Sequence, residues 1–247
     1  MRFRRFSLRP RRVSLPQRSL RRWIVVALGL GVLVAALAGA AGPLRQTQEF
    51  HQVMACERGV GDCFGSEPGS IAGRRTYTTT STTTHTDANG STYTTTSTTT
   101  HYEITWQRAD GSRQARDVSS SLYSKAKQGQ PATLRLWRGE VVGVEVMGGA
   151  QWFLPKSGTT LGGWLYLAFF GLGVLLWGLL FGWWDGLFML AFRTFAWMFM
   201  SFLPVDMTTD ALAYGLPTGT DLVVQILFAL FFTGIAGALL FGSLNGP

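Results

Sequence analysis

Residues 1–41 read MRFRRFSLRPRRVSLPQRSLRRWIVVALGLGVLVAALAGAA, a basic tail followed directly by an apolar run. Nine arginines lie in residues 1–22, whereas residues 23–41 carry no charge. A helix rises about 1.5 Å per residue, so residues 23–41 are long enough to cross a hydrocarbon layer about 30 Å thick. We therefore predict a first transmembrane helix at residues 23–41.

The arginines also predict the orientation of this helix. Arginine beside a membrane span is retained on the cytoplasmic side. We expect a multi-pass protein of the plasma membrane in which residues 1–22 form a cytoplasmic tail and residues 42–160 are extracytoplasmic. A cleavable signal peptide is the alternative, because the small residues at 36–40 fit a cleavage site.

Charge is distributed unevenly along the chain, so the net charge of +8 must be interpreted by segment. Residues 42–160 hold 12 Lys and Arg against 10 Asp and Glu, and only Arg193 is basic beyond them. Positive charge confined to one end of the chain is a topology signal, so we expect the lipid bilayer as a partner and no nucleic acid.

Further apolar runs follow in the last third of the chain. Residues 161–184 and 222–241 are each long enough to span, and residues 187–203 form a short transmembrane or interfacial helix. Residues 204–221 read as an acidic loop without Lys or Arg, as in exported loops. We predict four spans with both termini inside; the alternative is three spans with the C-terminus outside.

An exact repeat marks the extracytoplasmic segment. TYTTTSTTTH occupies residues 76–85 and recurs letter for letter at residues 92–101. Threonine favours extended backbone, and Asn89-Gly90 between the copies is a strong hairpin signal. The sequence therefore predicts a long antiparallel hairpin over residues 76–101, with strands that reach about 33 Å.

The predicted two-residue turn implies one register for this hairpin. With Asn89-Gly90 as its loop, His85 lies opposite Thr94 and His101 opposite Thr78. Neither face of the hairpin is apolar, so its register is weakly specified.

Ordinary strand patterns surround the hairpin. Alternating apolar residues and turn formers predict further strands and one short helix. The strands are expected at residues 102–108, 113–118, 132–137, 141–147 and 151–154, and the helix at residues 119–127. The fold class is thus a membrane α-helical protein of three to four transmembrane helices, with a small antiparallel β extracytoplasmic domain and a long Thr-rich hairpin.

The two cysteines, Cys56 and Cys63, both lie in the exported segment. An even count, close spacing and an oxidising compartment favour a disulfide between them. The alternative is a pair of free thiols.

Small residues recur every four positions in the apolar runs. One such face holds Ala27, Gly31, Ala35 and Gly39, and another holds Gly178, Gly182 and Gly186. Small-residue faces let helices approach closely in a bilayer, so we expect packing with a membrane protein partner or in a homo-oligomer.

Arg193 is the basic residue within an apolar run. A guanidinium at the bilayer centre costs about 2.5–3.5 kcal/mol on insertion scales. Arg193 is therefore a candidate intramembrane polar site that contacts a substrate or ion. The alternative is an interfacial helix from which Arg193 reaches the headgroups.

Motifs for chemistry are missing from the sequence. It contains no nucleophile-elbow, zinc-protease or phosphate-loop pattern, and we assign no catalytic, cofactor-binding or metal-binding residues. His85 and His101 end the two repeat copies without further ligands nearby, so we interpret them as surface histidines.

Three stretches carry a resemblance to other proteins. They are Cys56 to Cys63, the Thr-rich run that ends in Tyr102-Glu103-Ile104-Thr105-Trp106, and Gly129 to Val142. Together they are similar to uncharacterised multi-span membrane proteins of actinobacteria such as streptomycetes. The resemblance implies a host and an architecture and gives no catalytic residues.

These observations favour a non-enzymatic integral membrane protein of the cell envelope. Its β module would serve recognition or scaffolding, and its helices would anchor it or pack with subunits. The alternative is a small transporter or channel subunit that uses Arg193.

Overall fold

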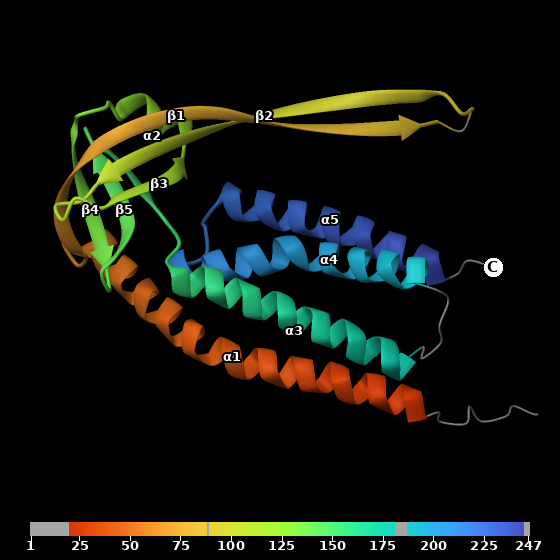
Figure 1. Ribbon diagram of the computed structural model, residues 1–247. Helices are drawn as coiled ribbons and strands as arrows, with labels where there is room; N and C mark the ends of the chain where they lie inside the picture. The colour runs from red at the N-terminus through yellow and green to blue at the C-terminus, as the bar shows by residue number, and fades with distance from the viewer. Residues whose placement is uncertain (1–19, 88, 181–186, 245–247) are drawn as a thin grey trace, which may run out of the picture. The chain divides into compact units, whose positions relative to one another are not determined.

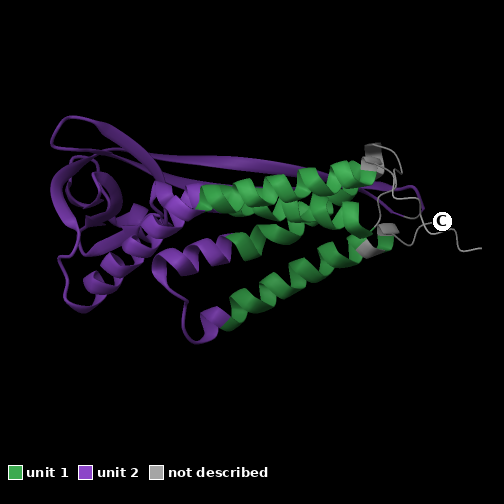
Figure 2. Cartoon of the chain, turned by 90° about the horizontal axis from the view of Figure 1, so that it is seen from below, with its two compact units in different colours: residues 1–40, 163–205, 223–247 green, residues 41–162, 206–222 purple. Residues whose placement is uncertain are grey.

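The computed structural model describes residues 20–87, 89–180 and 187–244. Most of the predicted basic tail, residues 1–19, lies outside this range, as do residues 181–186 with Gly182 and Gly186. The chain divides into two compact units, which Figure 2 shows in different colours. The helical unit comprises residues 1–40, 163–205 and 223–247, and the β unit comprises residues 41–162 and 206–222.

Four helices contribute to the helical unit, where they run side by side (Figure 1). They are α1 (Leu20–Gly59), α3 (Lys156–Leu180), α4 (Leu187–Tyr214) and α5 (Thr220–Leu244). Among the described residues, α1, α3 and α5 are long and apolar enough to cross a membrane. This confirms the prediction that the chain contains long apolar helices as well as a β domain.

Helices α1 and α3 touch backbone to backbone. A Cβ atom added at Gly29 would stand 2.5 Å from the Leu175 nitrogen, and one added at Gly171 would stand 2.8 Å from the Leu33 nitrogen. Only glycine permits this approach, which is the packing expected of small residues between membrane helices.

The face of α1 that packs within the chain differs from the predicted one. Gly29, Ala36 and Ala40 are buried, whereas Ala27, Gly31 and Ala35 are exposed. Positions four apart drift by about 40° per step around a helix of 3.6 residues per turn, so a strict four-residue stripe leaves the contact face. Of the predicted stripe only Gly39 packs, against the ring of Trp164.

Arg22 closes the end of α3. Its Nε donates to the Gly178 carbonyl at 2.8 Å, and its Nη2 donates to the Leu179 carbonyl. The last carbonyls of a helix have no N–H partner within that helix, and a positive charge is favourable there. The start of α1 and the end of α3 are thereby joined.

Two helices continue through a proline. Helix α1 passes Pro43, whose carbonyl accepts a 2.9 Å hydrogen bond from the buried Thr47 hydroxyl. Helix α4 passes Pro204 and ends at Tyr214, so the predicted loop 204–221 is wrong for its first half. A proline removes one helical hydrogen bond, yet α4 continues, and Thr209 and Ala213 on its following turns are buried.

The β unit is built on one six-stranded antiparallel sheet of order β3-β2-β1-β4-β5-β6 (Figure 1). Its elements are β1 (Gly65–Thr86), β2 (Thr92–Gln107), β3 (Arg113–Val118), α2 (Ser120–Lys125), β4 (Pro131–Trp137), β5 (Glu140–Val146) and β6 (Gly149–Trp152). The predicted order of strands and the short helix is confirmed. Strand β1 begins well before the repeat, which the sequence did not indicate.

The main core of the β unit includes side chains from the sheet and from α2. Trp106, Ile104 and Leu134 of the sheet are fully buried, and Leu122 and Ala126 contribute from α2 and the residue after it. Ser119 begins α2, and its hydroxyl accepts from the Leu122 N–H. Burial of this sheet face sets the register of the inner strands.

A second core involves the last turns of α1. Phe50 is fully buried, and its ring centroid lies 5.4 Å from that of Trp137 and 5.9 Å from that of Tyr214. A bulge in β5 shifts the register between Arg135 and Leu136. It allows both Val141 and Val142 to be buried, Val141 in the main core and Val142 in this second core.

Cys56 and Cys63 are paired as a disulfide, with 6.0 Å between their Cα atoms. Cys56 lies in the last turns of α1 and Cys63 lies just before β1. The bond therefore ties the end of α1 to the start of the sheet.

Candidate functional site

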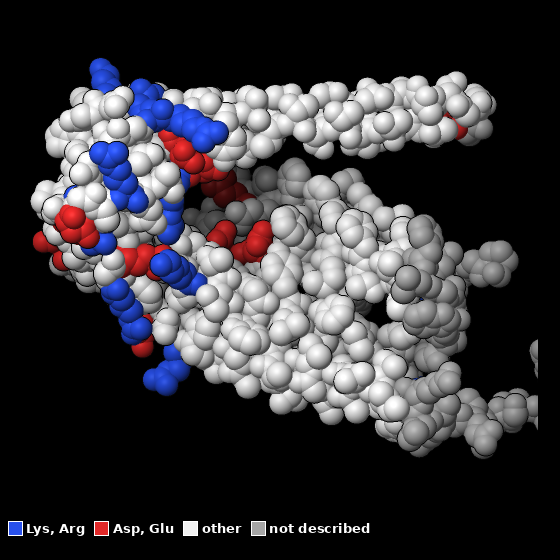
Figure 3. Space-filling view, in the orientation of Figure 1, with Lys and Arg blue, Asp and Glu red and all other residues white. Residues whose placement is uncertain are grey.

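The outer hairpin, residues 77–101, extends beyond both cores. Its side chains at 78–84 and 92–100 are all exposed, and Figure 3 shows this part of the surface without charge up to the turn. Strand β1 pairs with β4 only from Gly65 to Ser70 and continues with β2 alone. The outer hairpin is thus a two-stranded ribbon of hydroxyl groups.

Its register differs by one residue from the predicted one. His85 lies opposite Tyr93 and His101 opposite Tyr77, not opposite Thr94 and Thr78. The Gly90 N–H donates to the Asp87 carbonyl at 3.0 Å, and Gly90 has a positive φ of 82°. The hydrogen bond closes a β-turn at Asp87, and the positive φ of Gly90 is typical of the glycine bulge that follows such a turn.

Asp87 explains why this turn forms instead of the two-residue Asn89-Gly90 turn. Its Oδ1 accepts from the Asn89 N–H at 3.0 Å and from the Ser91 N–H at 2.8 Å. Asp at the first position and Gly at the fourth are typical of type I turns, and this signal was present in the sequence.

The observed register makes the repeat symmetric. Ser81 lies opposite Ser97, and the Thr residues on either side lie opposite Thr. A stacked pair of rings closes each end: Tyr77 with His101 at 4.7 Å, and His85 with Tyr93 at 5.0 Å between centroids.

A polar cluster surrounds the inner pair. The Tyr77 hydroxyl donates to Asp117, 3.0 Å from its Oδ2, and this hydrogen bond raises the pKa of Tyr77. His101 Nδ1 lies 3.5 Å from the same Oδ2, and His101 Nε2 lies 2.9 Å from the Thr79 hydroxyl. Sequence reasoning missed Asp117, because only the register brings β3 beside His101.

The order Asp117, His101, Thr79 follows the acid–base–nucleophile sequence of hydrolases. Such a site also needs N–H donors aimed at a developing oxyanion. The Asp87 N–H donates to the Ser91 carbonyl. Because hydrogen-bonded residues alternate along an antiparallel strand, the N–H groups of the odd-numbered residues of β1, including Thr79, also point toward β2 and not toward a substrate. The cluster therefore fits a clamp at the base of the outer hairpin better than a hydrolytic site.

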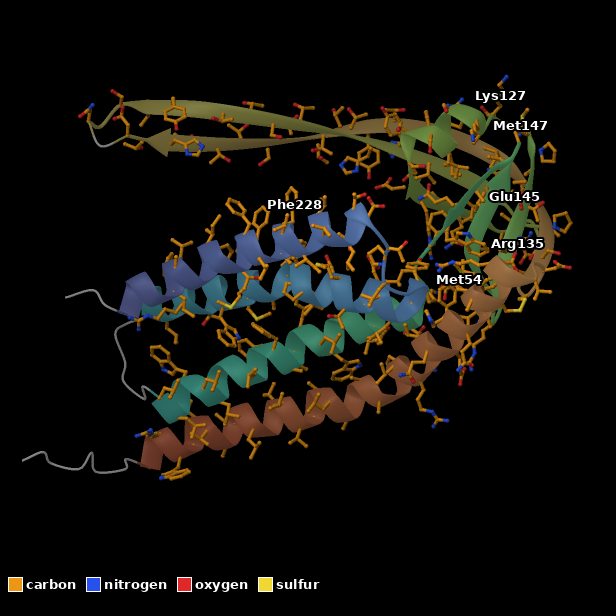
Figure 4. The ribbon with its side chains drawn as sticks, turned by 180° about the vertical axis from the view of Figure 1, so that it is seen from behind. Met54, Lys127, Arg135, Glu145, Met147 and Phe228 are labelled. Carbon is orange, nitrogen blue, oxygen red and sulfur yellow. A yellow bond between two sulfur atoms is a disulfide. The ribbon has the colours of Figure 1, made fainter. Side chains whose placement is uncertain are left out.

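A separate polar site surrounds Arg135 (Figure 4). Its guanidinium lies 3.7 Å from Glu57, 3.3 Å from Asp62 and 3.5 Å from Glu145. A cavity of about 200 Å³ beside it is also lined by Trp152. Arg135, Glu57 and Glu145 line this cavity, so two carboxylates face one cation there, and its volume is below the usual range for organic ligands.

Arg193 is 6% exposed and belongs to the helical unit. Its guanidinium carbon lies 5.1 Å from the centroid of the Trp177 ring. Trp177 precedes Gly178, to which Arg22 donates, so Arg193 lies near the same end of α3 as Arg22. This placement is near a helix end and away from the centre of the α3 span.

The two histidines of the repeat are on the ribbon surface beside tyrosines. Among the described residues, no group of three or more His, Cys, Asp or Glu side chains could hold a metal ion.

Comparison of the chain with protein-family models, with curated proteins and with solved structures finds no match. The functional interpretation therefore depends on the geometry described above.

Proposed function

We propose that this protein is a non-enzymatic integral membrane protein of the cell envelope, whose β unit stands outside the plasma membrane for recognition or scaffolding. In this proposal α1, α3, α4 and α5 cross the bilayer, and both termini face the cytoplasm. The similarity of three stretches to actinobacterial membrane proteins, described under Sequence analysis, supports this part of the proposal.

The outer hairpin is the observation that carries the proposal. The two cores of the β unit are complete without it, because its Thr and Ser side chains are exposed. A ribbon that adds nothing to the core but fixes many hydroxyl groups in register is suited to contact with another molecule. The clamp of Tyr77, His101 and Asp117 holds its base in place.

Shortening the hairpin tests this proposal. Removal of residues 78–85 and 93–100 takes out matched rungs and keeps Tyr77 opposite His101. Replacement of the same threonines by serine gives a control of full length. Cells would be cross-linked from outside, and the protein purified through a tag.

We expect the wild type and the serine variant to capture an extracytoplasmic partner that the shortened variant loses at equal membrane level. Recovery of the protein alone from the wild type, under several mild conditions, would count against the proposal.

A transporter or channel subunit is the second candidate, favoured by the burial of Arg193 within the helical unit. Replacement of Arg193 by Ala should then abolish transport at unchanged membrane level. A fall in level alone would identify a structural role, which its position near the end of α3 favours.

A further inference from the structure

The outer edge of β1 is open along the repeat. The loop after α2 covers β1 as far as Ala72, where the Gln128 side chain donates to the Ala72 carbonyl at 3.2 Å. Beyond Arg75 the strand carries no charge and no proline until Asp87. Natural edge strands are usually protected by such residues, and an unprotected edge is a template for another strand.

Backbone groups point outward along this edge at every second residue. Odd-numbered residues form the hydrogen-bonded rungs with β2, because the Asp87 N–H donates to the Ser91 carbonyl. The N–H and C=O groups of Thr78, Thr80, Thr82 and Thr84 therefore face away from β2. They need a partner strand or water.

The sequence of β1 is complementary to itself. Within the hairpin, the first repeat pairs antiparallel with an identical copy, and Ser pairs with Ser and Tyr with His. Two β1 strands from different molecules can therefore pair in the same way about a two-fold axis at Ser81. Tyr77 then lies opposite His85 of the second copy, as it lies opposite His101 within the hairpin.

Charge supports the same register. With Ser81 on the axis, Arg75 lies opposite Asp87 of the second copy, and both side chains are exposed. Asp87 uses Oδ1 for its own turn, and a carboxylate has a second oxygen to accept from a guanidinium. A slip by two residues would lose both Tyr–His rungs and both Arg–Asp pairs.

We infer that the outer hairpin binds a second copy of this chain through the β1 edge, which gives a four-stranded antiparallel sheet of order β2-β1-β1-β2. The contact is isologous, since the same residues of both copies meet across the axis. Even-numbered threonines provide its hydrogen bonds, and the Tyr77–His85 and Arg75–Asp87 rungs fix its register. Binding of a second copy is separate from the recognition function proposed above and does not depend on it.

Cysteine cross-linking in membranes tests the inference, because Ser81 and Ser97 occupy identical sequence contexts. Ser81→Cys places two thiols across the axis at about 4.5 Å between Cα atoms, within the range for a disulfide. Ser97→Cys is the matched control, because the two Ser97 positions lie about 14 Å apart in a four-stranded sheet. The full chain would be oxidised with a copper catalyst, with the Cys56–Cys63 disulfide retained.

We expect most Ser81→Cys chains to form a cross-linked dimer, and Ser97→Cys chains to remain at background. Equal cross-linking of both variants, cross-linking of Ser97→Cys alone, or none in either would overturn the inference.

A second measurement does not rely on introduced thiols. Two differently tagged copies would be co-expressed and purified through one tag. Arg75→Asp reverses the charge at both ends of the contact and should lower recovery of the second tag on the order of tenfold. Arg113→Asp, at an exposed arginine of β3, is the control and should leave recovery unchanged; equal losses in the two variants would contradict the proposed register.

Discussion

The guanidinium of Arg193 stacks over the ring of Trp177, with 5.1 Å from its carbon to the ring centroid. This pair joins α4 to α3 close to the end where Arg22 closes α3. A cation over an aromatic face contributes about 0.5–2 kcal/mol, depending on its access to water. The pair gives Arg193 a contact within the helical unit that involves no transported molecule, and we predict that this contact stabilises the unit.

A double-mutant cycle tests this role. Arg193→Gln and Trp177→Leu should each lower the apparent melting temperature in detergent, and the double variant should lose less than the sum of the two. The coupling should fall within about 0.5–2 kcal/mol. Additive losses would show that the two side chains are not coupled.

Met54 and Met147 provide a matched test of the second core (Figure 4). Met54 is 2% exposed, whereas Met147 is 73% exposed. Met54→Ala should lower the free energy of unfolding of the β unit by about 2–5 kcal/mol, because it leaves a cavity beside Phe50. Met147→Ala should change it by less than about 0.5 kcal/mol, and tryptophan fluorescence during denaturation would report both. Equal effects would contradict the observed packing.

The lowered pKa of Glu67 predicts that the stability of the β unit depends on pH in the acid range. Hydrogen bonds from Arg108 and from the Ala109 N–H hold the pKa of Glu67 below its usual 4.5. A carboxyl whose pKa is lower in the folded state stabilises the fold above its unfolded pKa, and this contribution disappears as pH falls through the folded pKa. Glu67→Gln should therefore be less stable than the wild type at neutral pH.

The difference between Glu67→Gln and the wild type should shrink as pH falls below 4.5. Denaturation midpoints of both proteins across this range would measure it. A difference that stays constant down to about pH 2 would show that the charge of Glu67 is not its cause.

Cysteine labelling tests the proposed topology. Single cysteines at Ser91, Thr218 and Ser243 would be placed in a background of Cys56→Ser and Cys63→Ser. Thr218 is chosen because it is exposed in the loop after α4, whereas Thr209 is buried. With four spans, an impermeant reagent should label positions 91 and 218 in intact cells, and position 243 only after permeabilisation. Labelling at 243 but not at 218 in intact cells would indicate three spans.

Local patterns predicted most of the β unit. Alternation of apolar residues located β3 to β6, since one sheet face must be buried. The repeat identified the outer hairpin. Its register depends on which of two turns forms: the predicted two-residue turn at Asn89-Gly90, or the observed turn that begins at Asp87. The hydrogen bonds to the Asp87 carboxylate favour the observed turn, and their effect outweighs the Asn-Gly signal.

Tertiary contacts decided what local patterns could not. The path of α4 through Pro204 depends on burial of its last turns, and the packing face of α1 depends on where Gly29 meets α3. Asp117, Glu57 and Arg135 gave no signal in the sequence, because their neighbours come from distant parts of the chain.

Arg22 has two successive tasks in the proposed topology. While the ribosome is still making the chain, its charge helps to hold the leading end in the cytosol. Gly178 and Leu179, whose carbonyls it later binds, are synthesised more than 150 residues afterwards. A substitution at Arg22 would therefore disturb both the early choice of orientation and the late closure of the bundle, and pulse labelling during membrane insertion could separate the two defects in time.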